Sequence, residues 1–119
     1  MRKLIVLVAL AALVTAPAVL AKERNVQMIG APIAPKAGQA WNATISVQID
    51  GKLQPGKAPI VRIVSAGGRT INVPSRATTE AGIYRARVVF PSAGTWRVIV
   101  VDRETGRAYE FNRMKVRAT

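Results

Sequence analysis

Ten residues near the middle of the chain, Trp41 to Asp50, alternate strictly between apolar and polar side chains. Successive side chains of a β-strand point to opposite faces, so this pattern predicts a strand with one face in a core and the other in water. A strand of this kind needs partner strands and a second layer that covers its apolar face. The feature therefore favours an all-β chain built from two layers.

The same period of two recurs along the rest of the chain, in short segments separated by turn residues. Gly67-Gly68, Pro91, Gly94 and Gly106 are the main turn signals, and a phase change near 112–113 indicates a β-bulge. The expected strands cover residues 25–29, 41–50, 60–64, 69–73, 82–90, 96–101 and 109–116. They predict an immunoglobulin-like antiparallel β-sandwich of about seven strands. Whether 83–90 and 95–101 pair as a hairpin or belong to different sheets stays open.

The first 21 residues have the pattern of a signal peptide and its helix. A basic start precedes an apolar run from Leu4 to Val14, and Val19 and Ala21 occupy the −3 and −1 positions of a cleavage site. An uncleaved anchor over 4–21 is the alternative, although this is short for a bilayer core of about 30 Å. We expect residues 1–21 to be a signal peptide and 22–119 one exported domain, without a membrane span after cleavage. Its location is then periplasmic, extracellular or on the cell envelope.

Two segments resemble the YtkA-like and FixH-like group of exported bacterial domains. They are AWNATISVQIDG, from residue 40, and GIYRARVVFPSAGTWRVIVVD, from residue 82. The resemblance spans roughly residues 25–117 and implies a small β-sandwich outside the cytoplasm, with relatives linked to cation pumps, copper handling or oxidase assembly. Its recurring positions are Gly82, Tyr84, Phe90, Pro91, Gly94 and Trp96.

Residue types that commonly carry catalysis or bind metal are scarce. The chain has no histidine and no cysteine, so we expect no enzyme activity, cofactor or metal site. Asp102 and Glu104 are expected to be solvated turn residues, and Glu110 to face solvent beside outer arginines. Met28 and Met114 are soft donors that can bind Cu(I), but core filling is the more common role of such residues.

Charge is the strongest compositional signal. The formal net charge is +12, and loss of Arg2 and Lys3 with the leader would lower it by two. Such a balance favours anionic partners. Nucleic acid is not expected, because the aromatic side chains share the phase of the core instead of forming an exposed stacking surface. The candidate basic interaction face consists of Arg85, Arg87, Arg97, Arg107, Arg113, Lys115 and Arg117.

The same arginines have a purely structural interpretation. Their long stems can cover the outward apolar residues Val89, Ile99 and Val101 while the guanidinium groups stay hydrated. Ile99 and Val101 could alternatively mark a contact with a partner. We therefore expect a non-catalytic interaction module that engages a protein or an anionic envelope surface. An accessory role in copper handling or in oxidase or cation-pump assembly is the alternative, and the oligomeric state is not predicted.

Overall fold

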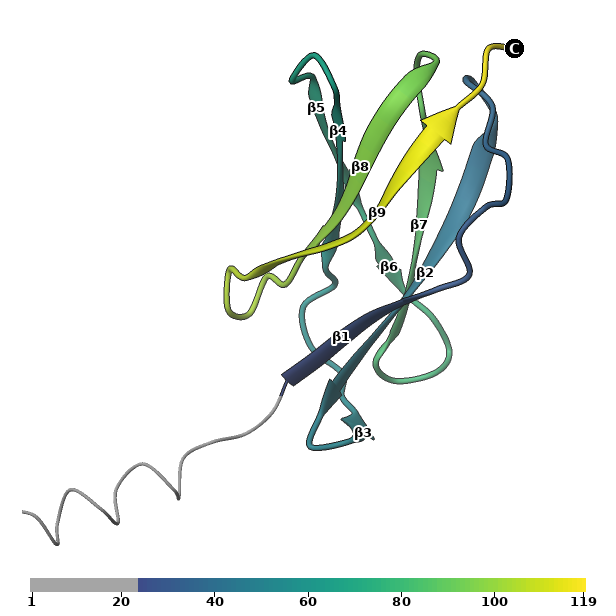
Figure 1. Ribbon diagram of the computed structural model, residues 1–119. Coiled ribbons are helices and arrows are strands. Elements are labelled where there is room, and N and C mark those ends of the chain that lie inside the picture. Colours follow the sequence, from purple (N-terminus) through teal and green to yellow (C-terminus); the bar gives the residue numbers. More distant parts are fainter. Residues whose placement is uncertain (1–23) are drawn as a thin grey trace, which may run out of the picture.

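The computed structural model describes residues 24–119 (Figure 1). The predicted signal peptide, residues 1–21, lies outside this part of the chain. All regular secondary structure within residues 24–119 consists of β-strands. The strands are β1 (Arg24–Ile29), β2 (Ala40–Ile49), β3 (Lys52–Leu53), β4 (Ile60–Ser65), β5 (Thr70–Pro74), β6 (Arg76–Ala77), β7 (Ile83–Val89), β8 (Gly94–Val101) and β9 (Ala108–Val116).

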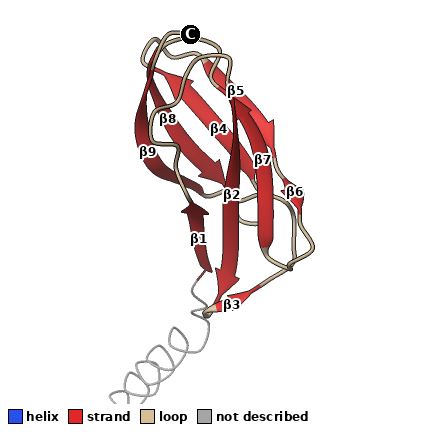
Figure 2. Ribbon diagram, turned by 90° about the vertical axis from the view of Figure 1, so that its right-hand side faces the viewer, coloured by secondary structure: helices blue, strands red, loops and turns tan. Residues whose placement is uncertain are grey.

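The strands form two antiparallel sheets, seen as two layers in Figure 2. One sheet has the order β1-β2-β7-β6, with β3 also paired to β2, and the other has the order β5-β4-β8-β9. The all-β prediction is confirmed at this level. The expected number of strands was too low, because β3 and β6 are only two residues long and cannot show an alternating pattern. Both strands lie in segments between the expected strands.

The core lies between the sheets and is built by the predicted alternation. In β7, Tyr84, Ala86 and Val88 are at most 3% exposed while Arg85 and Arg87 between them are exposed. Each large apolar side chain removed from water in this way contributes about 1.5–3 kcal/mol of hydrophobic stabilisation. Ala43, Ile45, Val47, Val61, Ile63, Trp96, Val98 and Val100 complete the inward-facing rows of β2, β4 and β8.

The link between β7 and β8 crosses from one sheet to the other, which answers the question that the sequence left open. Phe90 and Trp96, at the two ends of this link, are both fully buried, with ring centroids 6.0 Å apart. The indole N–H of Trp96 donates a hydrogen bond of 2.9 Å to the carbonyl of Ser92 inside the turn. Gly94 has a φ of 126°, a conformation that favours glycine. A hairpin is therefore excluded, and β7 and β8 belong to different layers.

Two further sequence expectations concern β9 and the turn before it. The register between β8 and β9 shifts between Val98 and Ile99, so that Phe111 is the extra residue of a β-bulge. After the bulge, Met114 and Val116 are buried again, at 6% and 4% exposed. Gly106, one of the expected turn residues, lies in the turn between β8 and β9 and has a φ of 76°, in the left-handed region that favours glycine. Both predictions are confirmed.

Gly82 shows why the chain needs a glycine immediately before β7. Its φ is +81°, and a Cβ atom there would lie 2.7 Å from the backbone nitrogen of Gln54 and 3.0 Å from the carbonyl oxygen of Val47. The carbonyl of Gly82 accepts a hydrogen bond from the N–H of Val47. The close approach of these three segments leaves no room for a side chain.

Candidate functional site

Three arginines gather on the outer face of the β1-β2-β7-β6 sheet, which points away from the core. Arg85 and Arg87 lie on β7 with exposed side chains, and Arg76 of β6 stands directly opposite Arg85. Residues that pair across an antiparallel ladder share a face, with Cα atoms about 5.5 Å apart at most. We call Arg76, Arg85 and Arg87 the arginine face.

The arginine face takes part in no ion pair in the part of the chain that the structure describes. On its other flank, β2 places Thr44 opposite Arg85 and Asn42 opposite Arg87. The three ion pairs found within residues 24–119 all involve other arginines.

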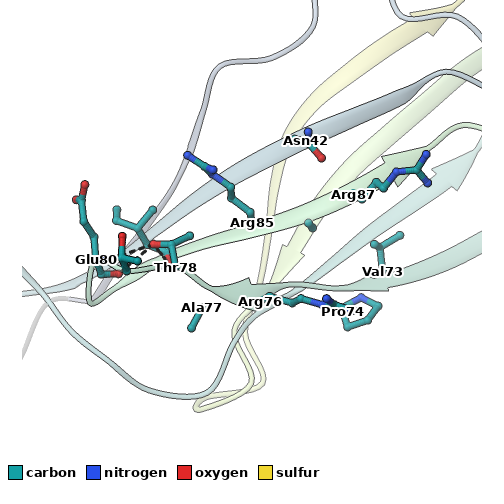
Figure 3. A pocket seen from close by; sticks show the side chains of 12 residues that line it. Asn42, Val73, Pro74, Arg76, Ala77, Thr78, Glu80, Arg85 and Arg87 are labelled. Atoms are coloured by element: carbon teal, nitrogen blue, oxygen red, sulfur yellow. Dashed lines mark hydrogen bonds between the residues drawn. The ribbon is translucent and has the colours of Figure 1, made fainter.

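A groove of about 700 Å³ runs beside the arginine face (Figure 3). Arg85 and Arg87 lie on one side of it, with Val73, Pro74 and Arg76 across from them. Its one acidic residue is Glu80, at one end. The complete lining is Asn42, Val73, Pro74, Arg76, Ala77, Thr78, Thr79, Glu80, Ile83, Arg85, Ala86 and Arg87.

The structure places the third arginine of the segment 82–102, Arg97, on the outer face of the other sheet. There its guanidinium group contacts the Glu110 carboxylate at 2.6 Å, and Arg113 approaches the same carboxylate at 3.9 Å. Glu110 is partly exposed beside these arginines, as expected. Lys115 follows two residues after Arg113 and is also exposed. The seven candidate basic residues thus do not form one continuous face.

Outer apolar residues on this second sheet are covered by their neighbours. Ile99 has the predicted outward phase, yet it is only 8% exposed, with Arg62 and Glu110 as its cross-strand neighbours. Ile99 therefore keeps its predicted outward phase but is covered, so it offers little exposed surface for the partner contact considered as an alternative. Val101 is half-buried. On this sheet the arrangement matches the structural interpretation, in which long polar side chains shield apolar residues.

The remaining two candidate residues lie outside the strands. Arg107 is in the turn between β8 and β9, where its guanidinium carbon lies 5.3 Å from the ring centroid of Tyr109, within cation–π range. Arg117 follows β9 and donates its backbone N–H to the carbonyl of Pro35. Neither residue contributes to the arginine face.

Asp102 differs from its expected role as a solvated turn residue. It is only 2% exposed, and its carboxylate accepts hydrogen bonds from the Arg24 side chain and, at 2.9 Å, from the backbone N–H of Glu104. A carboxylate is buried at acceptable cost when a cation and hydrogen-bond donors surround it. The expectation was wrong because Arg24 lies 78 residues away in the sequence. The pair joins β1 to the end of β8, across the two sheets.

The residues considered for copper are used for packing. Met114 is buried in the core, and Met28 is partly buried against it. Within residues 24–119, no three histidine, cysteine, aspartate or glutamate side chains gather as a metal-binding group. Glu104, the other acid of the turn, accepts a hydrogen bond from the backbone N–H of Lys57 at 3.1 Å.

Sequence reasoning missed one member of the arginine face. Arg76 stands in a two-residue strand after Pro74, where no alternation can be read. In the sequence, the feature that could have drawn attention to Arg76 was its position between two expected strands, at 69–73 and 82–90. Only the three-dimensional register identifies it as the partner of Arg85.

Comparisons with protein-family models, with curated proteins and with solved structures found no match to this chain. Among residues 24–119, no helix has the length and hydrophobicity needed to cross a membrane. A role for the arginine face is therefore argued from its own residues.

Proposed function

We propose that this chain is an exported, non-catalytic interaction module of immunoglobulin-like fold, which acts at the cell envelope and binds an anionic partner through the arginine face. The observation that carries this proposal is the contrast between the two outer faces. Arg97 and Arg113 share Glu110, whereas none of the ion pairs found within residues 24–119 includes Arg76, Arg85 or Arg87. An unneutralised cluster beside a groove attracts anions and raises their rate of association.

The strand order supports the immunoglobulin-like assignment. Constant-type immunoglobulin domains combine one sheet of strands A, B, E and D with another of C, F and G. Here β1, β2, β7 and β6 occupy the first four places, and β4, β8 and β9 the last three. β5 extends the second sheet, as an additional strand next to C does in variants of this fold.

The leader pattern supports export, and the residues shared with YtkA-like domains support a kinship with that group. Gly82, Phe90 and Trp96 all have structural roles at the β7–β8 crossing or where β7 begins. These roles explain why such positions would recur within a fold family. These structural roles do not indicate a chemical activity, so the proposed function depends on the arginine face.

Charge reversal on the two outer faces tests the proposal. The double substitution Arg85→Glu/Arg87→Glu should weaken binding of the purified protein to the native envelope fraction by about tenfold or more. Binding of the unaltered protein should also weaken steeply with salt, because the Debye length shrinks from about 10 Å at about 0.1 M to about 3 Å at about 1 M. Sedimentation of the protein with the envelope fraction measures both effects.

The matched control reverses the same number of charges on the opposite face. Arg113→Glu/Lys115→Glu changes the net charge equally but leaves the arginine face intact, so envelope binding should be retained within about twofold, apart from long-range effects that salt screens. Equal losses in the two variants would contradict the proposal, because they would show that only total charge matters. Binding that is insensitive to salt would contradict it as well.

A further inference from the structure

The ladder between β6 and β7 stops after two residue pairs, although β7 continues for several residues. Arg76 pairs with Arg85 and Ala77 with Tyr84. In the same register, Pro74 would stand opposite Arg87, but proline has no N–H to donate to a ladder. The chain instead enters the other sheet as β5, where Pro74 pairs with Ile60. One side of β7 is therefore left without a neighbouring strand from Ala86 to Val89.

The direction of the peptide groups along β7 follows from the hydrogen bonds at its ends. The carbonyls of Gly82 and Phe90 accept bonds from Val47 and Gly38, on the β2 side, whereas the carbonyl of Ile83 accepts from Thr78, on the β6 side. Because successive peptide groups of a strand alternate between its two sides, Arg87 and Val89 direct their N–H and C=O groups toward the open side. These groups can pair with another strand.

The open side of β7 is also where the groove lies. Val73, Pro74, Ala77 and Ala86 give the groove an apolar component, and the three residues of the arginine face line it as well. A strand added there would place alternate side chains on the outer face, opposite Arg87 and Val89, and the others toward Val73 and Ala86. The site therefore fits a peptide in which acidic residues alternate with small apolar ones.

We propose that the open side of β7 binds an extended acidic peptide of a partner protein as an added antiparallel β-strand. This inference rests on the proposed function, since it specifies the anionic partner of the arginine face. Main-chain hydrogen bonds to Arg87 and Val89 supply affinity, and carboxylates beside Arg76, Arg85 and Arg87 select an acidic sequence.

Other occupants fit the site less well. A second copy that offered the same edge in a two-fold arrangement would bring two arginine faces together, and the like charges would repel each other. A surface of anionic lipid headgroups would use the arginines but not the peptide groups of Arg87 and Val89. Binding experiments can distinguish each of these two occupants from the peptide.

The test uses a synthetic peptide of about eight residues in which glutamate and valine alternate, a length typical of one strand. Its affinity for the purified full chain is measured by calorimetry, and its site by amide chemical shifts. We expect shifts centred on Arg87 and Val89, and a loss of affinity of at least about tenfold in the Arg85→Glu/Arg87→Glu variant. The Arg113→Glu/Lys115→Glu variant should bind the peptide normally.

Two modified peptides separate strand addition from charge attraction. A glutamate opposite Arg87 directs its own N–H toward β7, whereas the neighbouring valines direct theirs away. N-methylation of the glutamates should therefore weaken binding about tenfold, through the loss of ladder hydrogen bonds, while N-methylation of the valines should be tolerated. Because the changes lie in the peptide, the folding of the protein is not affected.

Each outcome has a definite meaning. Equal binding of the two N-methylated peptides would overturn strand addition while leaving the arginine face as an anion-binding surface. Binding to phosphatidylglycerol vesicles but not to the peptide would overturn the inference in favour of lipid. A dimer in sedimentation that the Arg87→Glu substitution changes would overturn it in favour of a second copy. If no probe binds and charge reversal leaves envelope binding unchanged, the proposed function fails together with the inference.

Discussion

At the scale of single residues, the pair formed by Arg24 and Asp102 is the most consequential polar contact in the structure. Asp102 is almost fully buried, and the Arg24 side chain is 23% exposed. Removal of one partner would leave the other charge uncompensated in a poorly solvated place, which is more costly than loss of the attraction alone. Since Arg24 begins β1, the contact also holds the first strand against the opposite sheet.

A double-mutant cycle measures this contact. Asp102→Ala should lower the free energy of unfolding by about 2–4 kcal/mol, because it removes a buried charge pair and the hydrogen bond from Glu104. Arg24→Ala should be nearly as severe, and the double variant should lose clearly less than the sum of the two, with a coupling of about 1–3 kcal/mol. Urea unfolding provides the values. The control Arg103→Ala, in the same turn but exposed, should change the free energy of unfolding by less than about 0.5 kcal/mol. Strict additivity of the Asp102→Ala and Arg24→Ala effects would contradict the role given to the pair.

Residue-scale prediction from the sequence succeeded where a side chain's environment depends on its own strand. Trp96, Tyr84 and Val98 are buried because they share the inward phase. It failed for Asp102, whose burial depends on a distant arginine that no local pattern can reveal.

At the scale of elements, both sheets place arginines directly opposite each other, but with different surroundings. Arg76 faces Arg85 between β6 and β7, and Arg97 faces Arg113 between β8 and β9. Glu110 lies within 4 Å of both arginines of the second pair. Like charges placed opposite each other are destabilising, so the arginine face is maintained at some cost in stability, as expected of a surface kept for binding.

Two single substitutions should therefore change stability in opposite directions. Arg76→Glu converts a repulsive pair into an attractive one and should raise the free energy of unfolding by about 0.2–1 kcal/mol at low salt. Arg97→Glu gains an attraction to Arg113, but it replaces the 2.6 Å contact with Glu110 by a repulsion at close range, so it should lower stability by a similar amount. Thermal unfolding at low and high salt measures both, and the differences should shrink at high salt. Destabilisation by Arg76→Glu that persists at high salt would contradict the electrostatic account.

Prediction at the element scale depended on the length of each pattern. The seven longer strands could be found because each spans five or more residues, whereas β3 and β6 are two residues long. The partner sheet of β8 could not be predicted, because a turn with Pro91 and Gly94 suits either a hairpin or a crossing. The observed strand pairing decides for the crossing, because β7 pairs with β2 and β6 whereas β8 pairs with β4 and β9.

At the scale of the whole molecule, the structure separates basic residues that the sequence could only group together. Arg85 and Arg87 belong to one outer face and Arg97, Arg113 and Lys115 to the other. The net charge alone predicts attraction to anions anywhere on the surface. We propose that binding uses the face that combines several arginines with a groove and an open strand edge.

Site-specific photo-crosslinking in the intact envelope tests this central claim most directly. A photoreactive side chain would replace Asn42, which lines the groove opposite Arg87, or Thr70, an exposed residue on the outer face of the other sheet. We predict an adduct from position 42 that disappears when Arg85→Glu/Arg87→Glu is added, and none from position 70. An adduct at position 70 of equal yield, or one at position 42 that persists after charge reversal, would contradict the account.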